Sequence, residues 1–514
     1  MDYFSKAKRI FLKDLSKARN IQAGFYRNVP IASAPKHAGI RITARTFYKL
    51  YLNGEFLYYG PGRAAHETAR VDVIDITARL KCGHNALAIE LAGYNHPCLS
   101  VTGEYSFLQA EVEVDGQILD YTGKHWQGLR LLHRLSAVEN LTHARCASEV
   151  YNLDQDYYRW RTAPIQEPTG GKIALCPTEE LAGDMDLLPR SAMDPDFQLV
   201  GYQSLDQVSS VSTPPESEWT KTARIMTNTP KVIIDCGFAD RPVLQCLNDQ
   251  YGPFTGEIRM GAGRGLTHAQ EISVVTEDGA VALDFDFHSM TSAFPGIELT
   301  CESRATIDLI HVDKLTPDGS FNPRNCYAVT VIRLNCEPGH YCFEAFEPYG
   351  VRYLRVIVRG TRQFTLHDVY LRRCQYPDLK GGSFLCSDNS LNRIYDAARV
   401  ALVINTLDNF MDCPGRERGA WAMDSFWTGR AARLLFGECS VERAHLENYL
   451  APSIRKYYDL MPGCYPAGEA CFIHNWTIFL GLQIYEYYRR TNDLEFLRQH
   501  EDGIGWLIGT LSRY

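Results

Sequence analysis

The hydrophobic pattern of this chain changes its period near residue 381. Before that point, from 38 to 115 and again from about 230 to 378, short runs of alternating apolar and polar residues are separated by turn signals, which is typical of β-strands. After it, apolar residues such as Leu391, Ile394 and Ala398 recur every three or four positions, which indicates helices. The chain must therefore join a β-rich part to a helical part.

Local amino-acid composition divides these parts further. Residues 1–165 predict a β-sandwich, with a hairpin turning at Asn53-Gly54 in "YLNGEFLYYG". Residues 166–229 are rich in proline, glycine and hydroxyl residues and predict an irregular connector. Strand patterns resume over 230–380, beginning with "KVIIDCGF", and predict a second β-sandwich, whereas 381–514 predicts helices. A length of 514 residues agrees with about three domains.

Composition excludes several classes of protein. A net charge of −8 without a basic stripe opposes nucleic-acid binding. The apolar runs are shorter than the ~20 residues of a membrane-spanning helix, and the first twenty residues lack the apolar core of a signal peptide, so a cytoplasmic location is expected. Sixteen scattered cysteines without a CxxC pair favour reduced thiols, and no HExxH motif or close His/Cys cluster predicts a metal site. We expect no cofactor.

The stretch "DCPGRERGAWAMD", residues 412–424, carries the strongest chemical signal. Asp412 as a helix cap and Pro414 in the first turn predict that a helix begins here. On a helix, Glu417, Trp421 and Asp424 would share one face. Neither Glu417 nor Asp424 has a basic residue three or four positions away that could pair with it. An aromatic plate flanked by acids suits a sugar ring, although a solvated helix face with a buried tryptophan has the same spacing.

The motif "DCPGRERGAWAMDSFW" resembles that of the α-L-rhamnosidases of glycoside hydrolase family 78. So do "GGSFLCSDNSLNRIYDAA", "MPGCYPAGEACFIHNWTIF" and, in the β region, "YLNGEFLYYGPGR" and "GHNALAIEL". The resemblance implies a jelly-roll module and an (α/α)6 catalytic barrel that inverts anomeric configuration. It places Glu417 at the position of the general acid. It further implies that the sugar pocket is formed by Asp412, Asp424, Trp421, Trp476 and, in a less defined role, Arg416.

The chain departs from that family in its helical part. An (α/α)6 barrel has twelve helices, and the pattern after residue 385 predicts about five. The family's general base is a glutamate late in the barrel, and Glu469 in "YPAGEACF" is a weak substitute. We therefore expect the first part of a barrel that lacks its general base, in a chain related to enzymes that release terminal α-L-rhamnose from plant-type glycosides or polysaccharides.

Two other readings of the same residues stay open. In one, the chain is a non-catalytic carbohydrate-binding protein whose jelly-roll module binds the sugar and whose helical part is vestigial. In the other, the barrel is a glycosidase for a different sugar. The expected partner is in each case a carbohydrate, in the leading interpretation a rhamnoside, with no nucleic acid or membrane involved. Whether the chain forms a homodimer is left open.

Overall fold

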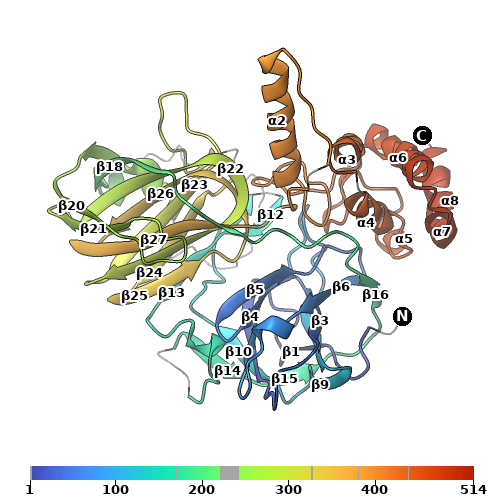
Figure 1. Ribbon diagram of the computed structural model, residues 1–514, viewed down its shortest axis with the longest axis horizontal. Coiled ribbons are helices and arrows are strands. Elements are labelled where there is room, and N and C mark those ends of the chain that lie inside the picture. Colours follow the sequence, from blue (N-terminus) through green and yellow to red (C-terminus); the bar gives the residue numbers. More distant parts are fainter. Residues whose placement is uncertain are drawn as a thin grey trace.

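A computed structural model describes residues 3–142, 144–167, 171–219, 242–325, 328–379, 381–437 and 439–513. Three parts follow one another along the chain (Figure 1): a first β-sandwich in blue and cyan, a second β domain in green and yellow, and a helical domain in orange and red. Both β domains lie beside the start of the helical domain. The fold class predicted from the sequence, two β domains followed by helices, is confirmed.

The first β-sandwich consists of two sheets packed face to face. One sheet has the order β15-β1-β8-β3-β6-β16 with β9 added to β8, and the other has the order β14-β10-β2-β7-β4-β5. Fully buried side chains such as Phe11, Phe25 and Leu50 fill the space between them. The strands are β1 (Ile10–Leu12), β2 (Ile21–Asn28), β3 (Ala38–Arg45), β4 (Phe47–Leu52), β5 (Glu55–Gly60), β6 (Thr68–Asp75), β7 (Ala86–Gly93), β8 (Phe107–Val114), β9 (Gln117–Tyr121), β10 (Gln127–Leu131), β14 (Ile173–Cys176), β15 (Thr178–Glu180) and β16 (Asp186–Pro189).

The hairpin expected at Asn53-Gly54 joins β4 to β5. Asn53 has φ +53° and Gly54 has φ +83°, which is the backbone conformation that a two-residue hairpin turn requires. The prediction of this turn is confirmed.

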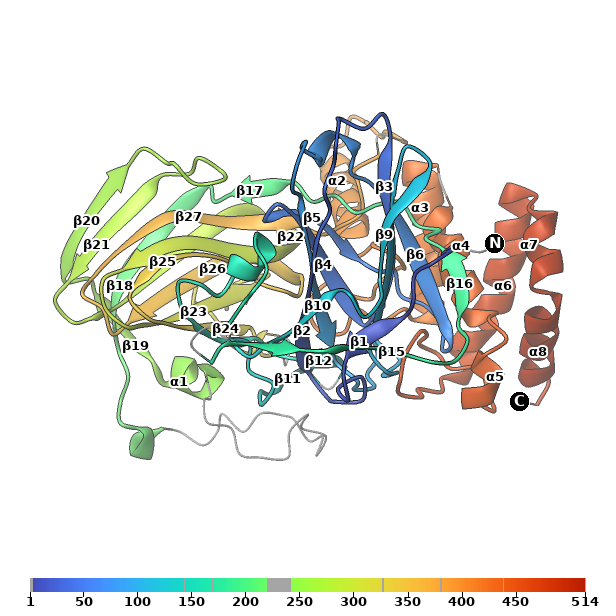
Figure 2. The same cartoon turned by 90° about the horizontal axis from the view of Figure 1, so that it is seen from below.

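The second β domain is built around a twelve-stranded sheet, in which β22 alone spans 22 residues (Figure 2). β22 pairs with β18, β25, β26 and β27. A small ribbon, β11 (Asn140–Thr142) and β12 (Arg145–Ala147), lies between β10 of the first sandwich and β13 of the second domain in sequence. The strands are β13 (Val150–Leu153), β17 (Leu199–Gly201), β18 (Ser204–Ser212), β19 (Gln250–Pro253), β20 (Gly256–Gly261), β21 (Glu271–Thr276), β22 (Ala280–Cys301), β23 (Ala305–Val312), β24 (Val331–Cys336), β25 (Gly339–Glu344), β26 (Tyr349–Arg359) and β27 (Gln363–Arg373), with helix α1 (Pro242–Asn248) before β19.

The prediction that 166–229 forms an irregular connector is wrong for its described residues. β14, β15 and β16 complete the two sheets of the first sandwich, and β17 and β18 join the second domain. β13, which we placed in the first domain, pairs in parallel with β24 of the second. The composition of this segment is polar because β14, β15, β16 and β17 each pair with a single strand, and because β14, β16 and β18 leave many side chains partly or fully exposed. The strand predicted for "KVIIDCGF" lies outside the described residues.

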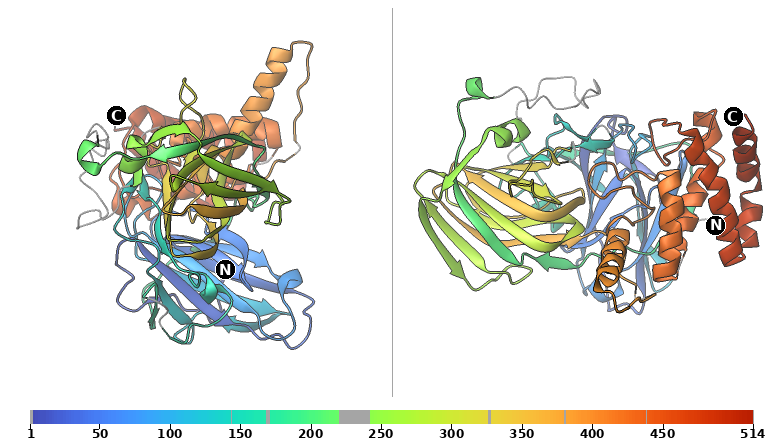
Figure 3. Two further views of the ribbon diagram at one scale, coloured as in Figure 1. Left: turned by 90° about the vertical axis from the view of Figure 1, so that its left-hand side faces the viewer. Right: turned by 90° about the horizontal axis from the view of Figure 1, so that it is seen from above.

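The helical domain contains α2 (Asn389–Ile404), α3 (Ala422–Phe436), α4 (Ser440–Tyr449), α5 (Ile454–Tyr457), α6 (His474–Thr491), α7 (Leu494–Gln499) and α8 (Glu501–Leu511). Asp388 caps α2, since its side chain accepts a hydrogen bond from the backbone N–H of Ser390. α2 projects away from the other helices (Figure 3), and its apolar Ile394 is 63% exposed. Within the described residues, no helix combines the length and the apolar character needed to cross a bilayer.

Candidate active site

Residues 412–421, hereafter the motif loop, are not helical as predicted. They form a turn at 414–417 and irregular backbone up to Trp421, whose extended φ and ψ of −73° and 133° make it the residue that precedes α3. Arg418 has φ +56°, a left-handed conformation that ends any helix started at Pro414. The prediction that Glu417, Trp421 and Asp424 share one helix face is therefore wrong, because Asp424 alone lies within a helix.

Glu417 nevertheless contacts Trp421, because the non-helical motif loop brings the two side chains together. The indole Nε1 of Trp421 donates a hydrogen bond of 3.1 Å to Glu417 Oε2. Arg416 pairs with the other oxygen, its Nη2 lying 2.8 Å from Glu417 Oε1. Only 9% of Glu417 is exposed. The turn thus holds one carboxyl between an indole N–H and a guanidinium, where the sequence had indicated an acid without a nearby basic partner.

Two further carboxyls lie within the electrostatic reach of Glu417. Burial raises the pKa of Asp412, and the negative charge of Glu417 raises it further. The same two causes, in the same order, raise the pKa of Asp424 in the first turn of α3. Asp412 is fixed by the motif loop itself, since its Oδ1 accepts a 2.8 Å hydrogen bond from the backbone N–H of Gly419.

An aromatic pair forms the apolar side of the site. The rings of Trp421 and Trp476 meet edge to face with centroids 5.0 Å apart, and Trp476 belongs to the first turn of α6. Trp421 also packs against Leu99 of the first sandwich and against Ala467 in the loop before α6. The structure therefore brings together the predicted site residues Asp412, Arg416, Glu417, Trp421, Asp424 and Trp476.

A buried ion pair anchors the motif loop to the first sandwich. Arg63 binds Asp408 through two guanidinium nitrogens, with Nη2 2.9 Å from Oδ1 and Nε 3.0 Å from Oδ2. Arg63 also donates to the backbone carbonyl of Arg418. Asp408 is 6% exposed, and although burial alone would raise its pKa, the charge and hydrogen bonds of Arg63 hold it well below the usual range.

Other contacts tie the loop to both β domains. Arg145 of β12 donates a 2.8 Å hydrogen bond to the carbonyl of Gly415 and pairs with Glu347 at 3.0 Å. Thr142 of β11 donates to the carbonyl of Arg416 at 2.8 Å. Arg418, 6% exposed, donates to the carbonyl of Pro348 in the second β domain at 3.0 Å. The loop is thus a junction of all three domains.

Sequence reasoning missed this anchoring set. Arg63 and Asp408 lie 345 positions apart, and Arg145 precedes its partner Gly415 by 270. No local spacing reports such contacts. The motif itself gave a weak signal, because Gly415 and Gly419 on either side of its charged residues make it a poor surface helix pattern.

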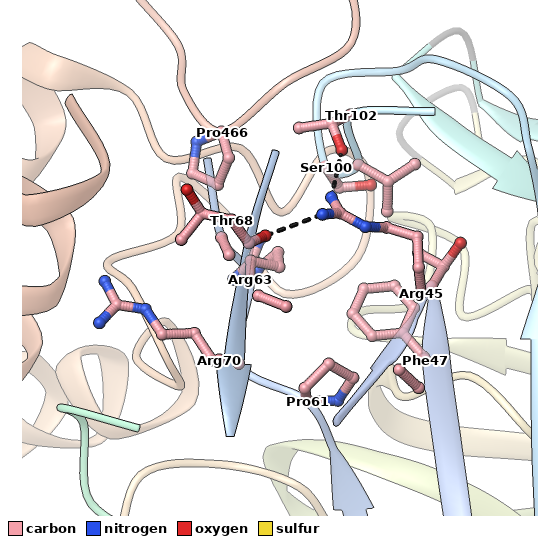
Figure 4. Close-up of a pocket in the computed structure, with 15 residues that line it drawn as sticks. Arg45, Phe47, Pro61, Arg63, Thr68, Arg70, Ser100, Thr102 and Pro466 are labelled. Carbon is pink, nitrogen blue, oxygen red and sulfur yellow. Dashed lines mark hydrogen bonds between the residues drawn. The ribbon is translucent and has the colours of Figure 1, made fainter. Parts of the chain in front are cut away.

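Two cavities lie between the domains, and residues of the motif loop line the larger of them. One of about 300 Å³ lies between the motif loop and the second β domain and is lined by Asp412, Pro414, Arg416, Tyr349 and His311 among others. The other, shown in Figure 4, lies between the first sandwich and Pro466, where Arg45 donates 2.8 Å hydrogen bonds to Thr102 and to the carbonyl of Thr68. Its volume of about 30 Å³ is the space of roughly one water molecule, so we assign it no organic ligand.

Comparisons with known proteins agree with this architecture. Residues 380–508 match the family model of the bacterial alpha-L-rhamnosidase 6 hairpin glycosidase domain. The structure of a GH78 family rhamnosidase of Bacillus sp. GL1 is similar with a TM-score of 0.81 at 19% identity, over 98% of this chain and 69% of that one. The alpha-L-rhamnosidase from Dictyoglumus thermophilum gives 0.62 at 17% identity, over 99% and 51%. A Streptomyces avermitilis alpha-L-rhamnosidase complexed with L-rhamnose gives 0.56 at 14%, over 96% and 42%.

These matches differ in what they cover. The family model spans the helical domain, whereas the structural likeness extends over almost the whole chain and shows its fold. The chain spans about two thirds of the length of the Bacillus protein and about half or less of the other two. A search of the curated proteins found no match.

Proposed function

We propose that this chain, whose helical domain is α-L-rhamnosidase-like, supplies the general acid and part of the sugar pocket of an inverting glycoside hydrolase that releases terminal α-L-rhamnose. The observation that carries the proposal is the position of Glu417. Its carboxyl lies between Arg416 and Trp421, with Asp412 and Asp424 within electrostatic reach. This is one acid beside an aromatic wall and two hydroxyl-binding carboxyls.

Each residue then has a distinct role. Glu417 donates a proton to the oxygen that leaves the sugar, which requires a carboxyl fixed in place at the bond being broken. Asp412 and Asp424 accept hydrogen bonds from sugar hydroxyls. Trp421 and Trp476 contact the apolar C–H face of the ring. The hydrogen bond from Trp421 to Glu417 couples the sugar wall to the acid and orients its carboxyl.

The second carboxylate of an inverting mechanism activates water from the opposite face of the sugar, roughly 6.5–9.5 Å from the acid. We place this general base outside the residues described, in further helices that would cover the exposed apolar side chains of α2, α3, α6 and α8. Support comes from Ile394, Leu434, Ile478 and Ile508, which are each more than half exposed. Burial against further helices would remove these apolar side chains from water.

Titration of the purified chain with L-rhamnose, followed by calorimetry, tests the proposal. We expect binding that is weakened at least tenfold by Trp476→Ala and left unchanged by Trp427→Ala. Trp427 is the matched control, because it lies on α3 but is 51% exposed and contacts Phe426 and Phe479 instead of Trp421.

The alternatives give different results in the same titration. Rhamnose binding that Trp476→Ala does not affect would place the sugar on the jelly-roll module and favour a carbohydrate-binding protein. Binding of another sugar in preference to L-rhamnose, lost in Trp476→Ala, would keep the site and change the substrate. Hydrolysis of an aryl α-L-rhamnoside by these 514 residues alone would refute our placement of the general base.

A further inference from the structure

Three ligand-type side chains meet on the outer face of the second β domain, on strands remote in sequence from the motif loop. Glu298 lies on β22, and His340 and Cys342 lie two residues apart on the neighbouring β25. Glu298 is the register partner of Cys342, and Thr300 is that of His340. Because side chains two residues apart share a face of a strand, all four project from the same side of the sheet.

The distances between the three groups fit a small tetrahedral cation. Cys342 Sγ lies 3.5 Å from His340 Nε2, and His340 Nε2 lies 3.3 Å from Glu298 Oε1. A zinc-like ion bound at about 2.3 Å to sulfur and about 2.0–2.1 Å to nitrogen and oxygen separates tetrahedral ligands by about 3.5 Å and about 3.3 Å respectively. The sulfur and the carboxylate lie within 4.8 Å of each other, which rotation of the half-buried Glu298 shortens.

A chain of hydrogen bonds orients the histidine. Glu271 Oε2 lies 2.7 Å from His367 Nδ1, His367 Nε2 lies 2.8 Å from the Thr300 hydroxyl, and that hydroxyl lies 3.1 Å from His340 Nδ1. If His367 donates to the Glu271 carboxylate, Thr300 donates to His367 and in turn accepts from His340 Nδ1–H. The lone pair of His340 then lies on Nε2, the atom that faces Cys342 and Glu298. Such an outer partner is what metal-binding histidines commonly have.

With that lone pair facing Glu298 Oε1 and Cys342 Sγ, a cation placed between the three groups would be attracted by all of them. We propose that Glu298, His340 and Cys342 bind a divalent transition-metal cation of the zinc type, with solvent in the fourth position. Burial and the charge of Glu298 raise the pKa of the Cys342 thiol to about 11, so the thiolate forms here when a cation compensates the two negative charges. The proposal does not depend on the glycosidase function.

The position of β25 indicates what such an ion would do. Among the described residues β25 pairs with β22 alone, and it therefore forms an edge of the domain. A metal bridging the two strands would fasten this edge and raise the thermal midpoint of the β domain.

Titration of the metal-free chain with Co²⁺ and Zn²⁺ tests the proposal. We expect one Co²⁺ per chain with a thiolate-to-cobalt charge-transfer band, and Zn²⁺ that displaces it. Cys342→Ser should abolish the band and His340→Gln should weaken binding at least tenfold. Thr300→Val, which removes the orienting hydroxyl but no ligand, should weaken binding by about tenfold or more.

Cys82→Ser provides the matched control, because Cys82 and Cys342 are the two exposed cysteines among the described residues and Cys82 lies on a turn of the first sandwich. This variant should bind Co²⁺ as the parent chain does. Absence of the charge-transfer band, or a band that persists in Cys342→Ser, would overturn the proposal, as would affinity that Thr300→Val and His340→Gln both leave unchanged. The variants alter half-buried or exposed side chains, and unfolding midpoints measured without metal verify that they fold.

Discussion

The two sides of the helical domain are built in opposite ways. On the side toward the β domains, the motif loop is buried, and arginines from other domains bind its carbonyl groups. By contrast, two apolar side chains of its helices, Leu434 of α3 and Ile508 of α8, are 79% and 62% exposed. The contrast teaches that the β domains, and not a surrounding ring of helices, hold the candidate acid in place.

Glu417→Gln is expected to have the largest effect, and it tests whether the buried motif loop supplies the general acid for hydrolysis. In a form of the protein that hydrolyses an aryl α-L-rhamnoside, it should lower kcat by about 100- to 10,000-fold, because an amide cannot donate the proton that a general acid supplies. Affinity for L-rhamnose should change little, since glutamine still accepts the hydrogen bond from Trp421. Steady-state kinetics and calorimetry measure the two quantities, and a variant that keeps its full rate would remove Glu417 from the mechanism.

Asp408→Asn removes the buried ion pair between Asp408 and Arg63, which anchors the motif loop. It leaves the buried Arg63 without its countercharge and should lower the free energy of unfolding by about 3–5 kcal/mol. The control is Glu55→Gln, which removes an ion pair with Arg79 whose side chains are 67% and 59% exposed, and should cost no more than about 1 kcal/mol. Urea unfolding compares them, and equal losses would show that the anchor does not hold the loop.

Acid should weaken the helical domain and the second β domain through one buried histidine in each. Burial lowers the pKa of His445 on α4 and of His311 on β23 to about 3. Below about pH 6.5 each of these histidines binds a proton in the unfolded chain but stays neutral in the folded chain. The free energy of unfolding therefore falls as the pH drops from 6.5 toward 3. Between pH 6.5 and 5.0 each histidine should cost up to about 2 kcal/mol.

His445→Gln separates the two contributions. This variant should remove the part of the acid-induced loss of stability that comes from the helical domain and leave the part that comes from the β domain. The free energy of unfolding measured at pH 7.5 and at pH 5.0 separates the two parts. His311→Gln is the reciprocal variant. If both variants keep the full pH dependence of the parent chain, the two histidines are not the cause.

The sequence predicted the order of the domains because the change from period two to period three or four is a local property of side chains. It also named residues that the structure brings together, but for Glu417 and Trp421 it did so through a helix that does not exist. A left-handed Arg418 and two arginines far away in the sequence, Arg63 and Arg145, decide the shape of the loop, and neither feature is a local pattern. The strands within 166–229 escaped prediction for a similar reason, since their partners lie in sheets whose other members are far away in the sequence.

Ile394→Lys tests the exposed side and should have the smallest effect. Ile394 lies on α2 at 63% exposure, so a charged side chain there should change the free energy of unfolding of this chain by no more than about 0.5 kcal/mol. Leu402→Ala on the same helix is the control, because Leu402 is 5% exposed and packs with Tyr376 and Phe436, and its truncation should cost about 2–5 kcal/mol. If further helices cover α2 in a longer form of the protein, Ile394→Lys should be costly there, because it would bury an unpaired charge. A costly Ile394→Lys in these 514 residues would mean instead that α2 already has a partner, and the comparison between the two sides would fail.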